Sequence, residues 1–470
     1  MSDRMDLECL WRERVARVLK GASFGDVLVS HSADGLRIEP LYAPAEEGAR
    51  AFRQEPERPW RIVQRVDHPD AAVASELALA DLEGGANALA VIFAGAPGAF
   101  GYGLAAPADL GAALVGVELD LIALTLDYAP FAAEAGVDAC LSLMRDRRLT
   151  PDRLAIGFGN DPVSDAASAG RVEPGAMAKA AALAVRLRET GFESGLMRAD
   201  GALHHEAGAT EAEELAATLA SALACLRALE AAGLPLDAAS AAIDFRLGVD
   251  QDEFLTIAKV RALRRLWAGI ETACGLTPRP IRIEARSSRR MMTASDGETN
   301  LLRLTLAGFS AAIGGADAIA LLPHAAAAGL PDAFARRLAR NMQHVLADEC
   351  RLAAVGDPAA GAGAFEALTA GLCERAYAIL QETERVGGIL AMLADCTWQA
   401  RLAASRSRRA EDIAAGRRVI LGVTLFPPKT ARPAAIFADV APSGPLSTND
   451  DRSRLAGSRD EELIGQEAAA

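Results

Sequence analysis

The sequence has no excess of positive charge and few aromatic residues. The first shortage argues against a nucleic-acid partner, and the second against a core built from aromatic side chains. Its 470 residues carry 49 Lys and Arg against 63 Asp and Glu, a net charge of −14. Nucleic-acid binding needs a basic surface, so this balance argues against a nucleic-acid partner. Aromatic residues make up only 5% of the chain, although apolar residues make up 51%. We therefore expect a large core built mainly from Ala, Leu and Val.

The sequence also lacks the marks of secretion and of membrane insertion. Its seven cysteines are scattered and form no CxxC pair, which is typical of a reducing compartment. The charged N-terminus has no apolar signal region. One long uncharged stretch, residues 84–108, contains GAPGAFGYG, which would break a membrane-spanning helix. We therefore expect a cytoplasmic protein with no membrane partner.

From about residue 85, short apolar runs alternate with Ala- and Leu-rich segments of helical spacing. The eight runs lie at residues 88–95, 119–127, 154–161, 195–203, 241–249, 280–288, 318–323 and 351–356. Continuous apolar strands that alternate with helices indicate a parallel sheet covered by helices. Eight units favour an α/β fold, a (β/α)8 TIM barrel over residues 85–380. A doubly wound sheet of six strands is the alternative.

The segments outside the predicted barrel have other characters. Residues 1–84 are punctuated by prolines and have too few periodic apolar positions for a core, so we expect an N-terminal arm that packs on another surface. Residues 381–428 predict a helical C-terminal extension. Residues 429–470 are polar, and we expect a mostly disordered tail because they can bury little apolar area.

The ends of the predicted strands carry the candidate polar residues of a barrel mouth. Besides the two clusters discussed next, they are Asn160, Asp161, Arg246 and His324. The run ARSSRR supplies Arg286, Arg289 and Arg290, which suit bidentate contacts to phosphate or carboxylate. The alternative is a set of solvated loop charges.

The densest ionisable cluster is His204-His205-Glu206. Adjacent histidines on a strand point to opposite faces, and no further ligand pattern accompanies them, so we expect no metal site. Thr210 and Glu213 after the cluster predict a capping box at the start of a helix. The glycine-rich GAPGAFGYG matches neither a P-loop nor GxGxxG, and no GxSxG is present. The residues alone therefore give a barrel without a complete catalytic set.

Several segments together resemble the methylmalonyl-CoA mutase family. They are LKGASFGDVLVSHSADGLRIEPLY (19–42), RPWRIVQRVDHPDAAVASELALADLEGGANALAV (58–91), HHEAGAT (204–210), IAKVRALRRLW (257–267) and RLARNMQHVLADECRLAAVGDPAAG (337–361). The resemblance runs from about residue 10 to 428. It implies a barrel that a CoA ester threads, followed by a cobalamin-binding domain with a DxHxxG motif. No DxHxxG occurs in these 470 residues, and the polar stretch after Pro428 leaves no room for such a domain.

The resemblance also implies that the reactive positions of the barrel are degenerate. Arg65 stands where catalytic chains have a Tyr over the substrate, and Gly159 stands where they have a Gln. Ala202 and Leu203 stand where they have a Tyr and a His, and that His hydrogen-bonds the thioester carbonyl. Losing such a donor costs about 2–4 kcal/mol of transition-state stabilisation. The resemblance therefore implies a chain with no catalytic residues of its own.

The role implied is the non-catalytic small subunit of a heterodimeric mutase. Its partner, the large catalytic subunit, would bind adenosylcobalamin and the acyl-CoA and interconvert (R)-methylmalonyl-CoA and succinyl-CoA. One alternative is the substrate-barrel chain of a split acyl-CoA mutase of the isobutyryl-CoA type, working with a separate cobalamin-binding protein. Another is a regulatory module that binds a CoA ester. In that case Arg286, Arg289 and Arg290, with His204 and His205, are the candidates to contact CoA.

Overall fold

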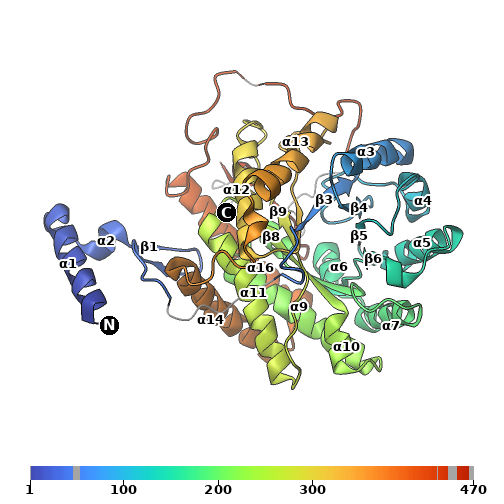
Figure 1. The fold of residues 1–470 in the computed structure, drawn as a ribbon, viewed down its shortest axis with the longest axis horizontal. Helices are drawn as coiled ribbons and strands as arrows, with labels where there is room; N and C mark the ends of the chain where they lie inside the picture. The colour runs from blue at the N-terminus through green and yellow to red at the C-terminus, as the bar shows by residue number, and fades with distance from the viewer. Residues whose placement is uncertain (1, 46–52, 431, 443–451, 465–470) are drawn as a thin grey trace.

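Eight short strands run parallel around a common axis and form the centre of the molecule (Figure 1). The computed structural model of the chain describes residues 2–45, 53–430, 432–442 and 452–464. The barrel strands are β3 Arg61–Val66, β4 Ala88–Ile92, β5 Ala123–Asp127, β6 Ala155–Gly157, β7 Met197–Asp200, β8 Ile243–Val249, β9 Ile283–Ser287 and β10 Ala318–Ala320. Helices follow each strand, so the predicted (β/α)8 barrel is confirmed.

The strand order is β6-β5-β4-β3-β10-β9-β8-β7. The two end strands of this order, β6 and β7, are joined by two backbone hydrogen bonds between residues in or next to them. The N–H of Phe158 donates to the Gly195 carbonyl at 2.9 Å, and the N–H of Arg198 donates to the Asn160 carbonyl at 3.0 Å. The sheet is therefore nearly closed, which leaves no long unpaired edge.

The first strand of the barrel was not predicted, and the last predicted strand is not one. β3 lies within residues 1–84, the segment predicted as an arm, and pairs with β4 and β10. It contains Gln64 and Arg65, so it lacks the continuous apolar run that identifies the other strands. Residues 351–356 were predicted as the eighth strand, and this prediction was wrong. They form the short 3-10 turn Leu352–Ala354 after Arg351, whose φ of 54° reverses the chain.

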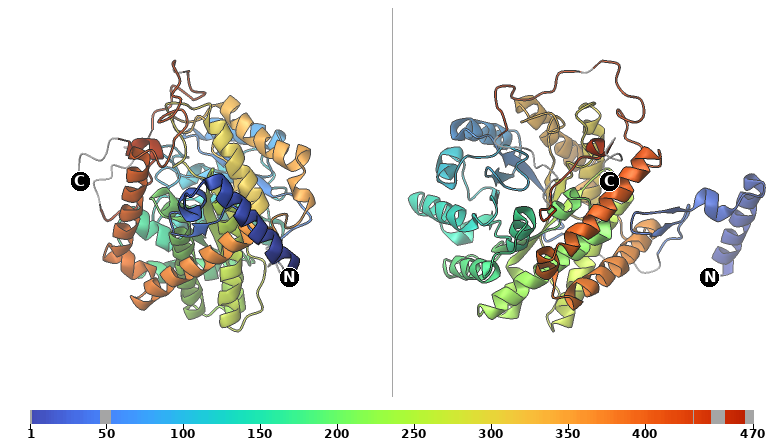
Figure 2. Two further views of the ribbon diagram at one scale, coloured as in Figure 1. Left: turned by 90° about the vertical axis from the view of Figure 1, so that its left-hand side faces the viewer. Right: turned by 180° about the vertical axis from the view of Figure 1, so that it is seen from behind.

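The surrounding helices are α3 Ala71–Glu83, α4 Leu110–Ala113, α5 Ala133–Asp146, α6 Pro162–Ala169, α7 Ala176–Glu189, α8 Ala202–Glu206, α9 Glu211–Ala231, α10 Leu236–Ala241, α11 Glu253–Ala273, α12 Asn300–Gly314 and α13 Ala333–His344. The C-terminal helices are α14 Gly363–Arg385, α15 Ile389–Ala394 and α16 Thr397–Ala414. α14 packs against α9 and α11. Most of α14 lies within residues 85–380, the range predicted as barrel, and α15 and α16 lie within the predicted extension 381–428. The C-terminal helices lie on the outside of the barrel (Figure 2). No helix in the described part of the chain is long and apolar enough to span a bilayer.

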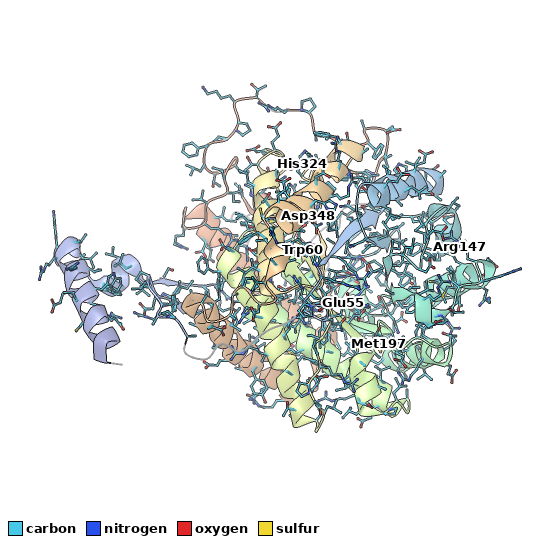
Figure 3. All side chains as sticks on the ribbon, in the orientation of Figure 1. Glu55, Trp60, Arg147, Met197, His324 and Asp348 are labelled. Carbon is cyan, nitrogen blue, oxygen red and sulfur yellow. The ribbon has the colours of Figure 1, made fainter. Side chains whose placement is uncertain are left out.

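The main core fills the space between the barrel and its helices and is rich in Ala, Leu and Val, as the composition predicts. Some of the few large side chains connect one structural element to another. Trp60, labelled in Figure 3, is 1% exposed, and its Nε1 donates to Oε1 of Gln343 at 3.1 Å, which ties the start of β3 to α13. Met197, also labelled, is fully buried on β7.

The N-terminal arm stands away from the barrel in Figure 1 and in the right view of Figure 2. It consists of α1 Ser2–Leu19, α2 Phe24–Leu28 and the hairpin of β1 Ser30–His31 and β2 Arg37–Ile38. The hairpin turn joins it to the barrel, because the carboxylate of Asp34 accepts a hydrogen bond from the Ala212 N–H at 3.2 Å, at the start of α9.

The polar C-terminal segment returns to the barrel. Leu455 and Leu463 are buried, and the N–H of Leu455 donates to the Ala167 carbonyl at 2.8 Å. The carboxylate of Asp460 pairs with Arg409 at 3.4 Å. The prediction of a mostly disordered tail was therefore wrong for residues 452–464. Residues 443–451 and 465–470 of that prediction lie outside the described residues.

Candidate functional site

A cavity of about 550 Å³ lies at the C-terminal ends of the barrel strands. Its walls are the loop 95–101 after β4, the starts of α6 and α8, and the ends of β7, β8 and β9. Residues 454–458 of the C-terminal segment form its roof. The volume falls within the range of about 300–1,000 Å³ that is usual for small-molecule sites, and barrel enzymes carry their sites at this end. This cavity is the candidate functional site.

All four positions that the resemblance marks as degenerate line this cavity: Arg65, Gly159, Ala202 and Leu203. Ala202 and Leu203 begin α8, a short helix directly after β7. Their side chains are purely aliphatic and offer no proton or hydrogen bond. The cavity thus lacks the polar donor that the resemblance places at Leu203.

Gly159 adopts a backbone conformation that excludes a side chain. Its φ is 64°, and a Cβ at this position would overlap the carbonyl oxygen of Leu126. Such a positive φ and close backbone contact require glycine. The backbone of this chain therefore leaves no space for the Gln that the resemblance places at this position.

Arg65 is held within the wall of the cavity. Its Nε donates to Oδ2 of Asp67 at 2.7 Å and its Nη2 donates to the Gly98 carbonyl at 2.7 Å. Its guanidinium lies 5.5 Å from the centre of the Phe100 ring. Arg336 also pairs with Asp67, at 3.2 Å. Burial opposes the charge of Asp67, but these two arginines outweigh it and lower its pKa.

The floor of the cavity is a network of buried ion pairs inside the barrel. The carboxylate of Asp127 on β5 pairs with Arg198 at 2.5 Å, with Arg246 at 2.9 Å and with Arg286. Arg246 also pairs with Asp200 at 2.8 Å and with Glu284 at 3.1 Å. Side chains from β5, β7, β8 and β9 therefore meet across the bore of the barrel and fill it.

The network holds its carboxylates ionised. Burial would raise the pKa of Asp127, but Arg246, Arg286 and Arg198 outweigh it and hold that pKa well below its usual value. Burial likewise opposes the charge of Glu284, and Arg246 and Arg286 lower its pKa to about 2. The bore is thus closed by charged groups that stabilise one another.

His204 and His205 are fully buried and do not line the cavity. The indole N–H of Trp398 donates to Nδ1 of His204 at 3.0 Å, and burial lowers the pKa of His204 to about 4. His205 Nδ1 lies 3.0 Å from Oε2 of Glu214, which also accepts from Nζ of Lys259 at 2.6 Å. Burial, reinforced by neighbouring cations, lowers the pKa of His205. Both histidines therefore sit in the layer between barrel and helices.

The three arginines of ARSSRR take different positions. Arg290 points away from the cavity, where Nη1 donates to the Ala209 carbonyl at 2.9 Å and Nη2 pairs with Asp250 at 3.2 Å. Arg286 belongs to the ion-pair network of the bore. Arg289 lines the cavity, and its guanidinium lies 5.0 Å from the centre of the Phe100 ring. The structure thus brings two of the three to the candidate site.

The other strand-end residues divide in the same way. Asp161 and Arg246 line the cavity. Asn160 instead anchors the backbone, with Nδ2 donating to the Ala180 carbonyl at 2.9 Å. His324 lies at a separate depression near residues 293–298. Asp161 was found by its place after a predicted strand, and Arg246 by its place within one.

Sequence reasoning missed the roof of the cavity and one wall. The roof comes from a segment that the sequence predicts to be disordered. The wall carries Ser164, Asp165 and Ser168 of α6, one turn apart on the helix face beyond Asp161. Periodic placement of polar residues on α6 was the available signal.

No cluster of three or more metal-binding side chains occurs among the described residues.

Comparison with known proteins places the chain in a family. The family model described as Methylmalonyl-CoA mutase matches residues 50–444. The methylmalonyl-CoA mutase small subunit of Streptomyces virginiae is 36% identical over 444 residues, which cover 91% of this chain and 70% of that protein. The small subunit from Propionibacterium freudenreichii subsp. shermanii is 31% identical over 482 residues, covering 97% and 73%. The methylmalonyl-CoA mutase of Escherichia coli K12 is 30% identical over 224 residues, covering 47% and 31%. The chain belongs to the methylmalonyl-CoA mutase family.

Proposed function

We propose that this chain is the non-catalytic small subunit of a heterodimeric, adenosylcobalamin-dependent methylmalonyl-CoA mutase. Its large partner subunit would interconvert (R)-methylmalonyl-CoA and succinyl-CoA. The observation that carries the proposal is the cavity at the barrel mouth, which has aliphatic groups at Ala202 and Leu203 and a floor closed by ion pairs. The small-subunit names of relatives that cover most of the chain support it.

The chemistry of the mouth argues against thioester activation by this chain. An acyl-CoA rearrangement needs a donor aimed at the thioester oxygen, and such a donor is worth about 2–4 kcal/mol. Leu203 has no donor to give. The buried His204 next to it already accepts a hydrogen bond from Trp398 and is turned away from the cavity. The neighbouring imidazole therefore does not replace the missing group.

The closed bore argues against a threaded CoA ester. To admit a pantetheine arm along the barrel axis, Arg246 would have to leave Asp127, Asp200 and Glu284. Asp127 and Glu284 would keep their ion pairs with Arg286, but breaking three buried or partly buried ion pairs at once is unfavourable. The acyl-CoA substrate is therefore proposed to be held by the partner.

The cavity also does not fit adenosylcobalamin. No histidine or cysteine lines it within the described residues, so no side chain of that kind can reach a cobalt ion there. Its roof is occupied by residues 454–458 of the chain itself. We therefore place the cofactor on the large subunit, and we derive no step of the reaction through this chain.

The N-terminal arm is the proposed contact with the large subunit. α1 and α2 stand away from the barrel (right view of Figure 2), and apolar side chains on them are exposed. Leu10, Val18 and Val27 are 44%, 78% and 54% exposed. Exposed apolar side chains on a projecting helix are typical of a surface that a partner covers.

Co-expression with the full-length mutase chain of the same organism tests the proposal. Native mass spectrometry should detect a one-to-one complex of the two chains. The visible absorbance of the purified complex should correspond to one cobalamin per complex. Turnover of methylmalonyl-CoA should require the large subunit and be absent from this chain alone. A large subunit that is fully active as its own dimer, with no complex formed, would contradict the proposal. Activity with a free-standing cobalamin-binding protein would instead establish the split-mutase alternative.

A further inference from the structure

Two arginines at the cavity have no carboxylate within ion-pair distance in the described part of the chain. Arg289 makes only a cation–π contact with Phe100, and its Nε is buried without a hydrogen-bond partner. Arg454 is exposed to solvent at the edge of the cavity and donates from Nε to the Ser168 carbonyl at 2.9 Å. Arg289 is partly buried, and a guanidinium withdrawn from water without an anion is energetically costly. Burial indeed lowers the pKa of Arg289, and nearby Arg459 adds to this effect.

The carboxylates nearest to Arg289 are engaged elsewhere. Glu206 accepts hydrogen bonds from the backbone N–H groups of Arg289 at 2.7 Å and Arg290 at 3.1 Å. Glu462 accepts from Nε of Arg459 at 2.8 Å. Neither carboxylate is therefore a counter-ion dedicated to the Arg289 guanidinium. The Arg289 guanidinium therefore has no carboxylate of its own among the described residues that line the cavity.

The opposite wall does not repel an anion as strongly as its residue types suggest. Burial raises the pKa of Asp165 on α6 to about 8, and Asp161 adds to the effect. Burial and Asp200 raise the pKa of Asp161 to about 6. Near neutral pH, Asp165 is therefore mostly protonated and can donate a hydrogen bond. On the side of Arg289, the cavity also offers the side chain of Ser287, whose Oγ accepts from the Leu322 N–H and keeps its proton to donate.

The shape of the cavity limits what it can hold. The bore beneath it is closed by Asp127 and Arg246, so a long chain cannot pass through. The roof is anchored by backbone hydrogen bonds, from Leu455 to the Ala167 carbonyl at 2.8 Å and from Ser458 to the Glu206 carbonyl at 3.2 Å. Leu203 and Leu455 give the cavity an apolar side. A fitting ligand is therefore short, with one charged end and a small apolar body.

We propose that this cavity binds a short organic anion, a carboxylate or a phosphate on a body of a few carbon atoms, between Arg289 of the barrel and Arg454 of the C-terminal segment. Arg289 receives the anion through charge-assisted hydrogen bonds. Arg454 approaches from the roof, so the bound anion links the C-terminal segment to the barrel. This site belongs to the small chain itself and does not depend on the mutase reaction.

Isothermal titration of the full-length chain at pH 7 tests the inference. The probes are succinate, glycerol phosphate and inorganic phosphate, with putrescine as a cation of similar length. Succinate or glycerol phosphate should bind, and the tighter of the two identifies the source of the anionic group. Putrescine should give no heat. Binding of inorganic phosphate as tight as that of the organic anions would overturn the requirement for a carbon body.

Two variants locate the site. Arg289→Ala and Arg454→Ala should each weaken binding about tenfold or more, which corresponds to about 1.4 kcal/mol. Arg454 lies on the C-terminal segment, so its loss leaves the barrel fold intact. Arg186→Ala is the matched control, because Arg186 pairs with Asp138 on the outer surface. It should bind as the unaltered chain does.

Hydrogen exchange supplies a structural readout, since bound anion should slow exchange in residues 452–464. Absence of heat with every anion, or equal binding by the two cavity variants and the control, would overturn the inference. The titration needs no large subunit, so failure of the heterodimer would leave its result unaffected.

Discussion

At the scale of single residues, Arg246 joins three carboxylates of the barrel. Its guanidinium contacts Asp127, Asp200 and Glu284, all within 3.1 Å. We predict that Arg246→Met lowers the free energy of unfolding by about 3 kcal/mol, because Asp200 would lose its ion pair and Asp127 and Glu284 would keep only their other arginine partners. Urea denaturation followed by circular dichroism measures the change.

The matched control for that variant is Arg186→Met. Arg186 pairs with Asp138 at 2.8 Å, and the two side chains are 41% and 56% exposed. Exposed pairs contribute at most about 1 kcal/mol, so this variant should hardly change the unfolding free energy. Equal losses in the two variants would contradict the role given to the buried network.

Asp165 predicts a dependence of stability on pH. Its pKa rises from the ordinary 3.8 to about 8 in the folded chain, mainly through burial. The folded state therefore binds this proton more tightly than the unfolded state. The resulting stabilisation is fully present below about pH 4 and is lost as pH rises through 8.

Asp165→Asn removes this titration. The variant should lose less stability than the unaltered chain between pH 5 and pH 9, since its side chain stays neutral at both values. Urea denaturation at the two pH values gives the comparison. Identical losses in both proteins would show that Asp165 does not hold its proton in the folded state.

Some residue-scale features were predictable and others were not. The capping box of Thr210 and Glu213 was predicted from four consecutive residues and is confirmed, with Thr210 N–H donating to Glu213 at 3.0 Å. Asp127 gave no such signal. Its partners Arg198 and Arg246 lie 71 and 119 residues away in the chain, and only closure of the barrel brings them together. Local patterns cannot report contacts of this kind.

At the scale of elements, the sequence predicted seven of the eight barrel strands, although the inner faces of β8 and β9 carry Arg246, Glu284 and Arg286. The strand β3 escaped because it lies in a proline-punctuated stretch and places Gln64 and Arg65 side by side, which interrupts its apolar run. The segment 452–464 escaped because backbone bonds and ion pairs, not apolar area, hold most of it. Its partners, such as Ala167 and Arg409, are distant in the sequence.

The arm gives a prediction at this scale. Deleting residues 1–28 removes α1 and α2 but keeps the hairpin turn at Asp34 and the strand β3. The thermal midpoint of the isolated barrel should stay nearly unchanged, because α2 buries no residue of its own and Asp34 keeps its bond to α9. Affinity for the large subunit should fall strongly, since the exposed apolar side chains of the arm are gone.

Native mass spectrometry and calorimetry of the deleted chain measure the two effects separately. The boundary at residue 28 matters, because a deletion through residue 80 would remove β3 and open the barrel between β4 and β10. Full recovery of the heterodimer by the chain without residues 1–28 would show that the arm does not contact the partner.

At the scale of the whole molecule, the bore of the barrel is divided into two unlike halves. One half is lined by small apolar groups, among them Ala88, Ala90 and Ala320. The other half supplies the arginines and carboxylates of β7, β8 and β9. The long charged side chains extend from their half of the bore toward the small alanine side chains of the other half. Many residues together therefore block a passage along the barrel axis.

This division predicts that restoring the reactive residues will not restore the reaction. In the combined variant Arg65→Tyr, Ala202→Tyr and Leu203→His, Asp67 still keeps its ion pair with Arg336 at 3.2 Å, so the chain should fold. The closed bore and the backbone of Gly159 are unchanged. We expect no succinyl-CoA when the isolated variant is given adenosylcobalamin and methylmalonyl-CoA, as measured by liquid chromatography. The unaltered chain with its large subunit is the positive control. Turnover by the variant alone would mean that the ion pairs around Arg246 open for substrate. The residues at positions 65, 202 and 203 would then be the whole reason why the unaltered chain is inactive.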